Sequence, residues 1–458
     1  MRPFIPLIAM IAVSGLAGPP AAAAGPGAEL GGPPAAPAGL SLQEAIRTGL
    51  ERNAMLEAAR AEADADEAGA RAAEAVRWPR LTGELGWRRT DNAVYVFMDK
   101  LTAGTFSVED FQIDRLNHPD PLSHGVAALG FEVPLDASGR IRAGIDAARG
   151  AAGAARARAR AAETDLATRI TEAYFGLALA RSAVGVAESA LAGARGYERS
   201  AAARVEAESA LRSDLLRAQV RRSERERDLE RRRADRSLAW ARLRSLLESP
   251  AGEAPELTTP LTPPERDPGL LQEWTAQALQ ARPEVEAARR SAEAIRAAGR
   301  AARAEIGPDL AAMARYERNT DAFDTGQGSV VAGISLRWAA FDRARSARIA
   351  AADARARAAE AGARGLEEAV RFEVESAWHD AHVADHALVA AREAAGAAEA
   401  ARRITAERYA AGLLPLTDLL DIETALLSAQ LAELTALHDA VVGRAHLARA
   451  AGSLEVRP

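Results

Sequence analysis

Residues 50–60 of the chain read LERNAMLEAAR, and residues 279–289 read LQARPEVEAAR. Each segment leads to a similar turn, which is Pro79-Arg80-Leu81 in the first case and Pro308-Asp309-Leu310 in the second. Residue 279 follows residue 50 by 229 positions, and residue 308 follows residue 79 by the same 229, so no gap separates the two stretches. Self-similarity of this kind predicts that the chain contains two copies of one structural unit.

The duplication continues further along the chain with a shorter offset. Ala173-Tyr174 matches Ala377-Trp378, and Ser213-Asp214 matches Thr417-Asp418, in both cases 204 positions later. The first copy therefore carries 25 extra residues, all of them between Leu81 and its next helix. A repeat that stays in register through long segments and accepts one insertion predicts a duplicated architecture.

Composition narrows the class of protein. The 458 residues include 4% aromatics and abundant alanine, and Lys100 is the single lysine among many arginines. Abundant Ala, Leu, Glu and Arg favour long helices packed through small side chains. The net charge of −6 argues against a nucleic-acid-binding protein. Neither a Ser/His/Asp arrangement nor a phosphate-binding loop nor a Cys/His cluster is present, so the sequence predicts no enzyme and no cofactor.

Residues 1–24 have the pattern of a secretory signal peptide. Arg2 precedes an apolar run over residues 4–16, and four alanines at 21–24 provide a small-residue cleavage site. A transmembrane anchor is the weaker interpretation, because Pro6 and Gly15 interrupt a short run.

The ends of the mature chain are expected to lie outside its folded part. Residues 25–39 are rich in Pro, Gly and Ala and predict a flexible N-terminus, and residues 453–458 form a C-terminal tail. After the signal we find no apolar stretch of about 18 residues, so we expect membrane insertion to use strands.

Each copy is predicted to contain an opening helix, two strands, a long helical run and a returning helix. Ser41 and Glu44 form a capping box at the start of the first opening helix, and Pro283 is expected to break the second. About 68 residues at 1.5 Å each make a long run of roughly 100 Å, as long as an opening and a returning helix together. We therefore expect the two shorter helices to lie end to end beside the long one, in coiled-coil packing. The predicted ranges are 41–77, 140–207 and 213–247 in the first copy, and 268–306, 343–410 and 417–451 in the second.

The segments between the opening and long helices alternate with period two. They span about 80–89 and 125–136 in the first copy, and about 309–318 and 329–341 in the second. Within residues 81–88, 126–135, 310–317 and 330–338 of these segments, the charged residues share one face and the large apolar residues share the other. This pattern is typical of membrane barrel strands with aromatics near the lipid interfaces, although a half-buried soluble sheet alternates in the same way. The candidate interface aromatics are Trp87, Phe131, Tyr316 and Trp338.

Four strands cannot close a barrel in a bilayer, where about eight are the practical minimum. An open sheet edge in lipid leaves backbone groups without hydrogen bonds. Several copies of the chain are therefore expected to share one barrel, with their helices forming a hollow tube beneath it.

With this plan the chain resembles the TolC-type outer-membrane efflux proteins. The resemblance covers about residues 40–452 and depends on the duplicated plan, on Pro79-Arg80-Leu81, and on the segment from Tyr409 to Asp421. It implies a mainly α protein with a membrane β-barrel, whose repeats 40–249 and 269–452 are joined by an equatorial linker at 250–268. It also implies a homotrimer, with a barrel of about twelve strands in the outer-membrane lipid and a tunnel of long helices in the periplasm. The expected partners are a periplasmic adaptor and an inner-membrane pump of RND or ABC type.

The resemblance also implies a gate at the periplasmic end of the tunnel. Asp418 and Asp421 match the family's acidic ring and Tyr409 matches its aromatic latch, with Ser213 and Asp214 as the counterpart in the first copy. Capping of the helix N-terminus is the alternative interpretation for Asp214 and Asp418, whereas Asp421 lies too far along for capping.

One position departs from the family pattern. The family has a basic residue four positions before the first acidic one, where this chain has Leu414. Closure by packing is therefore the alternative to a Tyr–Arg pair within the second copy.

By the same resemblance, the turns between long and returning helices are the tips that meet the adaptor. The candidate docking residues are Ser209 and Leu211 in the first copy and Gly412, Leu413, Leu414 and Pro415 in the second.

Two further features have open interpretations. The insertion, at about 90–123, carries Tyr95, Phe97, Phe106 and Phe111, and it either constricts the outer mouth of the channel or packs as a surface loop. His379, His382 and His386 share a helix face and are weak candidates for metal ligands, because a solvated polar face is the ordinary interpretation. We therefore predict no metal site.

The sequence favours an outer-membrane exit duct of a tripartite efflux system and leaves two alternatives. One is the exit channel for type I protein secretion, which has the same fold. The other is a soluble periplasmic coiled-coil scaffold with a small sheet.

Overall fold

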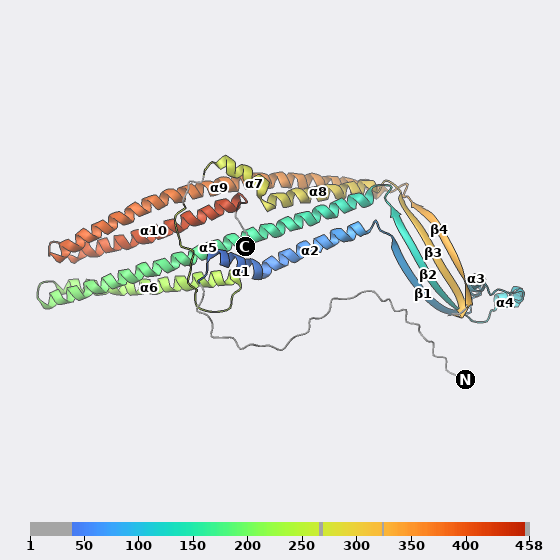
Figure 1. Cartoon of the computed structure of the whole chain (residues 1–458), viewed down its shortest axis with the longest axis horizontal. Coiled ribbons are helices and arrows are strands. Elements are labelled where there is room, and N and C mark those ends of the chain that lie inside the picture. Colours follow the sequence, from blue (N-terminus) through green and yellow to red (C-terminus); the bar gives the residue numbers. More distant parts are fainter. Residues whose placement is uncertain (1–38, 265–268, 323–324, 454–458) are drawn as a thin grey trace, which may run out of the picture.

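The computed structural model describes residues 39–264, 269–322 and 325–453. The predicted signal peptide, nearly all of the predicted flexible N-terminus, residues 265–268 of the linker and residues 454–458 of the tail lie outside the described residues. The described chain is an elongated rod of helices with a sheet at one end (Figure 1). The predicted fold class, long helices in a duplicated plan with four strands, is confirmed.

Each copy has the predicted helix–strand–strand–helix order. The helices of the first copy are α1 (Leu42–Arg52), α2 (Ala54–Ala75), α5 (Arg140–Glu206) and α6 (Arg212–Leu247). Those of the second are α7 (Leu271–Ala281), α8 (Pro283–Ala304), α9 (Arg343–Ala410) and α10 (Leu416–Ala450).

The first opening helix is broken, contrary to the single helix predicted over 41–77. Asn53 leaves the helical conformation (φ −67°, ψ 116°), and its side chain accepts a hydrogen bond from the backbone N–H of Leu56, so it caps α2. In the second copy Pro283 begins α8, where its missing N–H costs no hydrogen bond. Both copies therefore bend at the same place, one through an asparagine cap and one through a proline.

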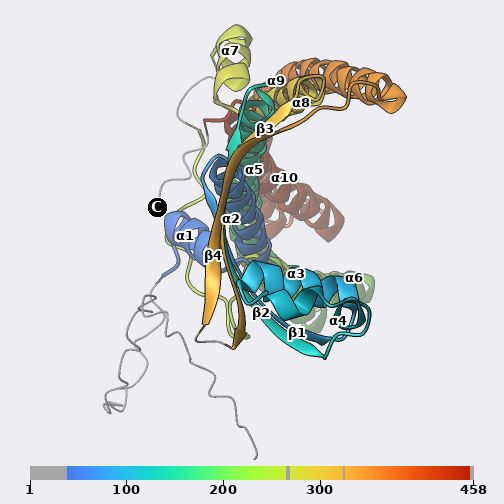
Figure 2. The ribbon, with the colours of Figure 1, turned by 90° about the vertical axis from the view of Figure 1, so that its right-hand side faces the viewer.

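The helices form a single curved layer with α5 and α9 as its long members. Near the sheet the order across the layer is α2, α5, α8, α9, and near the tips it is α6, α5, α10, α9. The shorter helices lie end to end beside the long ones, as predicted from their lengths (Figure 1). Figure 2, which looks along the rod, shows the curvature of this layer and of the sheet.

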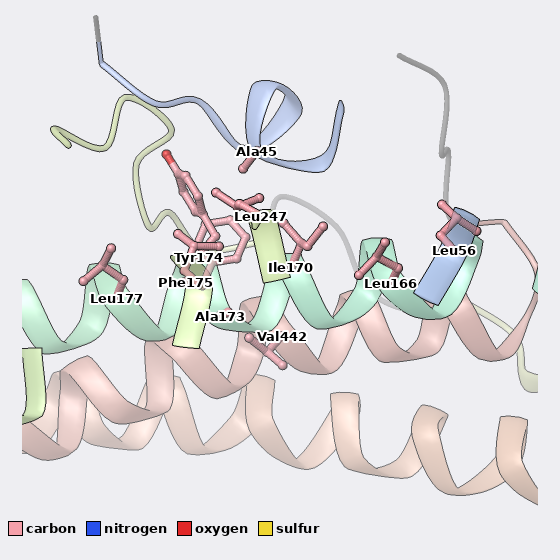
Figure 3. Packing of buried hydrophobic residues seen from close by; sticks show 11 residues of the cluster. Ala45, Leu56, Leu166, Ile170, Ala173, Tyr174, Phe175, Leu177, Leu247 and Val442 are labelled. Atoms are coloured by element: carbon pink, nitrogen blue, oxygen red, sulfur yellow. The ribbon is translucent and has the colours of Figure 1, made fainter. Parts of the chain in front are cut away.

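The largest core cluster lies at mid-length, where α1 crosses α5. Tyr174 is fully buried there beside Ile170 and Leu177 (Figure 3). Its hydroxyl donates to the carbonyl oxygen of Leu40 at 2.8 Å and accepts from the N–H of Thr259 at 3.0 Å. Burial of one such side chain contributes about 1.5–3 kcal/mol. The segment between α6 and α7 is therefore held against the middle of the rod.

One expectation about the helices is wrong. Among the described residues, α5 is long and apolar enough to cross a membrane by length and composition, although we expected no such helix after the signal. Its alanines, leucines and valines pack against α2, α6, α8 and α10 instead, because the close helix packing of this layer requires small apolar side chains.

The four strands form one antiparallel sheet in the order β1-β2-β3-β4. Both outer strands have an unpaired edge, so the sheet is open on two sides. β3 and β4 reach further towards their shared turn than the sequence pattern predicted, and β4 ends one residue before Trp338. The bounds are β1 (Arg80–Thr90), β2 (Leu122–Leu135), β3 (Asp309–Ala322) and β4 (Thr325–Arg337).

The insertion of the first copy folds into short helices between β1 and β2. They are α3 (Ala93–Ala103), the 3-10 helix η1 (Val108–Phe111) and α4 (Ile113–Asn117). Figure 1 places them at the end of the sheet that is far from the long helices.

Candidate periplasmic gate and outer mouth

The two tips of the rod have the same backbone geometry. In the second copy the N–H of Gly412 bonds to the carbonyl of Tyr409 and the N–H of Leu413 to that of Arg408, at 3.0 and 2.9 Å. Glu208 occupies the equivalent position in the first tip, and both residues adopt left-handed conformations, with φ 54° for Glu208 and 75° for Gly412. Such a turn ends a helix by satisfying its last carbonyl groups, and it favours glycine.

Tyr409 is buried between the two hairpins. Its ring packs in a cluster with Ala201 of α5, Ala218 of α6, and Leu416 and Leu419 of α10. The side chains in this cluster come from both copies of the repeat, so it fastens one hairpin tip to the other.

Arg204 of α5 supplies a cation to Tyr409. Its guanidinium carbon lies 4.6 Å from the centre of the Tyr409 ring. The same guanidinium donates to the carbonyl oxygens of Tyr409 and Ala410, at 3.3 and 3.2 Å. This Arg–Tyr contact joins the long helices of the two copies.

A second polar contact joins the hairpins one to two turns above the first. The Tyr197 hydroxyl donates to the Glu423 carboxylate, and the Arg402 guanidinium lies 3.9 Å from the same carboxylate. Burial, followed by the bond to Glu423, raises the pKa of Tyr197 to about 12. Arg225 of α6, which is buried, donates to the hydroxyl of Thr424 at 3.1 Å.

The predicted acidic residues face away from this cluster. Asp418 and Asp421 are exposed, whereas the intervening Leu419 and Leu420 are buried. No cationic side chain pairs with either carboxylate among the described residues. The two aspartates therefore share a solvated side of α10 one turn apart, which is the arrangement that an acidic ring requires.

Side-chain capping does not explain Asp214 or Asp418. The N-caps of α6 and α10 are Leu211 and Pro415, and neither provides a side-chain cap hydrogen bond. Asp214 and Asp418 lie in the first turn, where a carboxylate interacts favourably with the helix dipole. Within the described residues, Ser213 and Asp214 make no side-chain hydrogen bond or ion pair with Tyr409.

The candidate adaptor-docking residues lie at the tips. Leu211 and Leu413 are 70% and 72% exposed, which is unusual for leucine in a packed helical protein. Ser209, Gly412 and Pro415 are also exposed, and Leu414 is partly exposed.

The sheet separates apolar from polar side chains as the alternation predicted. The strand register places Leu81, Leu129 and Tyr316 on one face, and this face is exposed. Trp87 lies near the outer end of the sheet, Trp338 lies just beyond β4 at the inner end, and Phe131 and Tyr316 lie between them. An exposed apolar face of this size requires a partner, and lipid is the partner expected for a strand pattern of this kind.

The other face of the sheet carries charge. Arg315 of β3 pairs with Glu84 of β1 at 2.9 Å and with Glu317 at 3.1 Å. Because Glu84 and Arg315 lie on different strands with β2 between them, this ion pair spans β2 on the charged face. Helix α3 of the insertion contacts the same face, and Figure 2 shows this helix on the concave side of the sheet.

The insertion is anchored to the concave face. Asp99 of α3 is buried and pairs with Arg88 of β1, and its carboxylate lies 3.7 Å from the ring of His124 on β2. His124 in turn contacts the side-chain oxygen of Asn319 on β3 at 3.1 Å. This buried polar network ties α3 to three strands.

The rest of the insertion has its own small core. The rings of Phe97 and Phe106 meet edge to face at 4.8 Å, and those of Phe106 and Phe111 do so at 5.1 Å. Lys100 pairs with Asp110 at 2.6 Å, and the hydrogen bond from this ammonium lowers the pKa of Asp110 to about 2. The insertion is therefore a folded element with aromatic packing and an internal ion pair.

The three histidines and Trp378 form a chain of ring contacts along α9. His382 stacks on Trp378 at 5.3 Å with an interplanar angle of 6°, and it contacts the edge of His386 at 4.7 Å. Within the described part of the chain, no group of three or more His, Cys, Asp or Glu side chains is arranged to hold a metal ion.

The sequence indicated Tyr409, Asp418 and Asp421 but not the polar residues that join the two hairpin tips. Arg204, Tyr197 and Glu423 belong to no motif, and each lies far in sequence from the residue that it contacts. The duplication contained the one sequence signal for Arg204, because a shift of 204 positions aligns it with Arg408, which directly precedes Tyr409.

Comparisons with known proteins agree with this geometry. A family model described as outer membrane efflux protein matches residues 45–249 and 274–453. No curated protein sequence matches the chain significantly.

Solved structures give the same result for the fold. The chain is similar to CusC, with a TM-score of 0.76 at 19% identity over 90% of this chain and 92% of that one. VceC from Vibrio cholerae matches with a TM-score of 0.75 at 22% identity, over 90% of this chain and 96% of that one. The open state of MtrE from Neisseria gonorrhoeae matches with a TM-score of 0.75 at 22% identity, over 90% of this chain and 88% of that one.

Fold and sheet chemistry together define a non-enzymatic channel of the outer membrane, with a barrel-forming sheet and a helical tunnel in the periplasm. The chain belongs to the outer membrane efflux protein family.

Proposed function

We propose that this channel is the exit duct of a tripartite efflux system and acts as a homotrimer docked to a periplasmic adaptor and an inner-membrane pump of RND or ABC type. The observation that supports it most directly is the open sheet, apolar on its outer face and charged on its inner face. The described residues of each chain supply four strands, so a closed barrel needs further copies, and three give about twelve strands.

The duct is passive, and its periplasmic end is the gate. The hairpin tips are fastened by Arg204 to Tyr409 and by Tyr197 to Glu423, and separating the hairpins requires both contacts to break. Asp418 and Asp421 lie beside them and form no ion pair within the described part of the chain, so three copies concentrate negative charge at a narrow opening. Leu211 and Leu413 at the tips offer an apolar contact to an adaptor.

The insertion narrows the outer mouth. Asp99 anchors the insertion through contacts with His124 and Arg88. In the strand register these two residues lie on the charged, concave face of the sheet. A folded element on this face lies inside a closed barrel, so three insertions would crowd the mouth from within.

A membrane preparation tests the proposed function. The expected result is a carbonate-resistant protein whose trimer dissociates on heating and which gives discrete currents in planar bilayers. A monomer recovered from the soluble periplasm would instead support the coiled-coil scaffold, which leaves the apolar outer face of the sheet unexplained.

A further inference from the structure

The helical layer has two free edges. Helix α9 forms one edge, with α7 packed against it near its middle, and the opposite edge is α2 near the sheet and α6 near the tip. The sheet repeats this arrangement, because its unpaired strands are β1, which follows α2, and β4, which precedes α9. Figure 2 shows the layer curved with these edges apart.

The free edge of α2 has the spacing of a helix-packing seam but no partner. Five exposed alanines recur at intervals of three and four residues, opposite the buried Leu56 and Ala63. They are Ala58, Ala61, Ala65, Ala68 and Ala72. Four exposed carboxylates of α2 make no ion pair and no side-chain hydrogen bond among the described residues, whereas both of its arginines, Arg60 and Arg71, are paired. These carboxylates are Glu57, Glu62, Asp64 and Asp66.

The free edge of α6 carries the opposite charge. Exposed Val220 and Leu238 lie at heptad spacing with Arg227 and Arg231 between them. Six arginines of α6 have no ion pair and no side-chain hydrogen bond among the described residues. Of the α6 carboxylates, Asp214 alone has no ion pair or side-chain hydrogen bond with a described residue. The six are Arg212, Arg217, Arg227, Arg231, Arg236 and Arg244.

Helix α9 changes the sign of its free charge along its length. Exposed Phe372, His379, Ala390, Ala397 and Ile404 form a stripe whose intervals are seven residues, or eleven (seven plus four) between His379 and Ala390. Towards the sheet four arginines are unpaired among the described residues, and no carboxylate is. Towards the tip five carboxylates and two arginines, Arg403 and Arg408, have no ion pair with any described residue. The four arginines are Arg343, Arg355, Arg357 and Arg364, and the five carboxylates are Glu375, Asp380, Glu393, Glu399 and Glu407.

We propose that a second copy of this chain docks on each edge through this charge-inverted seam, acidic α2 against the basic half of α9 and basic α6 against its acidic half. The proposal specifies the trimer interface, and so it rests on the proposed function. A copy in the same orientation meets opposite charge along the whole seam. An inverted copy meets like charge in both halves, which is strongly unfavourable at an interface. The seam therefore selects one orientation and drives a head-to-tail ring.

The duplication predicts the register of the seam. Within one chain the long helix of the first copy contacts the returning helix of the second, for example through Tyr197 and Glu423. Between chains the equivalent pair is the long helix of the second copy and the returning helix of the first. A shift of 204 positions converts Tyr197 to Ala401 and Glu423 to Gln219, so these two residues form the equivalent contact between chains. About two turns further from the tip on both helices, the same register places Glu393 beside Arg227.

Cross-linking tests this register directly, because the full-length chain contains no cysteine. The variant Arg227→Cys with Glu393→Cys is expected to form dimers and trimers linked by disulfides on non-reducing gels. Each single variant, and the pair Arg227→Cys with Glu407→Cys, should not, since residue 407 lies 14 positions, or roughly 21 Å, along α9 from residue 393.

Charge reversal tests the recognition itself. Glu393→Arg is expected to lower the heating temperature at which the trimer dissociates, and adding Arg227→Glu should recover most of that loss. A trimer that survives in detergent but forms no disulfide with the matched pair, or no recovery in the double reversal, would overturn the seam and leave the duct intact. Absence of any trimer in the wild-type chain would instead overturn the proposed function.

Discussion

The Arg204 guanidinium lies 4.6 Å from the centre of the Tyr409 ring and also donates to the Tyr409 backbone carbonyl, so one side chain of the first repeat holds both the ring and the backbone of the second. The contact crosses from α5 to α9 at the tips, where the channel is proposed to close. A cation over a tyrosine ring is worth about 0.5–1 kcal/mol when exposed and about 2 when desolvated, and the hydrogen bonds add to this.

Removal of Arg204 should loosen the gate. We expect Arg204→Ala to raise open probability in planar bilayers by roughly 5- to 30-fold, which corresponds to about 1–2 kcal/mol. Arg199→Ala is a matched control, because Arg199 is exposed on the same helix and has no ion pair or side-chain hydrogen bond among the described residues. Equal behaviour of the two variants would remove Arg204 from the gate.

Tyr197 should make the same tip sensitive to alkali. Its pKa is raised to about 12, so its contact with Glu423 contributes stability that is complete below the ordinary tyrosine pKa of 10 and is lost as pH rises towards 12. Channel opening is therefore expected to increase between pH 10 and 12. Tyr197→Phe should be more open at neutral pH and should lose this pH-dependent increase. An unchanged alkaline response in the variant would assign the titration to another group.

The two tips should respond oppositely to changes at their left-handed residues. Gly412→Ala adds a Cβ that meets nothing within 4 Å, so its cost is conformational, about 1 kcal/mol. Glu208→Gly removes that same strain from the first tip and should stabilise it by a similar amount. Thermal unfolding of the single and double variants measures both, and a double variant close to wild type is the expected result.

The duplicated architecture was predictable because helix and strand periodicities are local properties of the sequence. Alternating residues from Leu81 to Trp87 place the apolar face of β1, and absence of proline gives α5 and α9 their length. The break at Asn53 was not predicted, since asparagine ends a helix only when its neighbours favour a cap. The Arg204–Tyr409 contact was not predictable either, because it depends on how two hairpins from distant parts of the chain pack. Leu414 suggested the absence of a cationic partner for Tyr409, whereas the partner comes from the other repeat.

The modification rate of Lys100, the single lysine of the chain, reports on the insertion at the outer mouth. Lys100 pairs with Asp110, which has a pKa lowered to about 2, so this pair stabilises the insertion above about pH 4 and is lost as pH falls towards 2. Modification of Lys100 by an amine reagent at neutral pH is expected to be faster in Asp110→Asn than in the wild-type chain. Asp120→Asn, in the same insertion but without an ion pair among the described residues, is the control. Equal modification rates in all three proteins would show that the Lys100–Asp110 ion pair does not stabilise the insertion.

The acidic residues of α10 should set the ion selectivity of the duct. Asp418 and Asp421 are exposed, have no cationic partner among the described residues, and lie one turn apart, so three copies place six carboxylates around one opening. Asp418→Asn with Asp421→Asn is expected to reduce preference for cations and to weaken block by multivalent cations, while leaving the trimer stable. Asp439→Asn, further up the same helix, removes one carboxylate per chain away from the tip and serves as the control. Selectivity that falls only in the double variant places the acidic ring at the tip, because the charge nearest the narrowest point dominates the field that an ion meets on entry. Unchanged selectivity and block in the double variant would contradict the assignment of Asp418 and Asp421 to the gate.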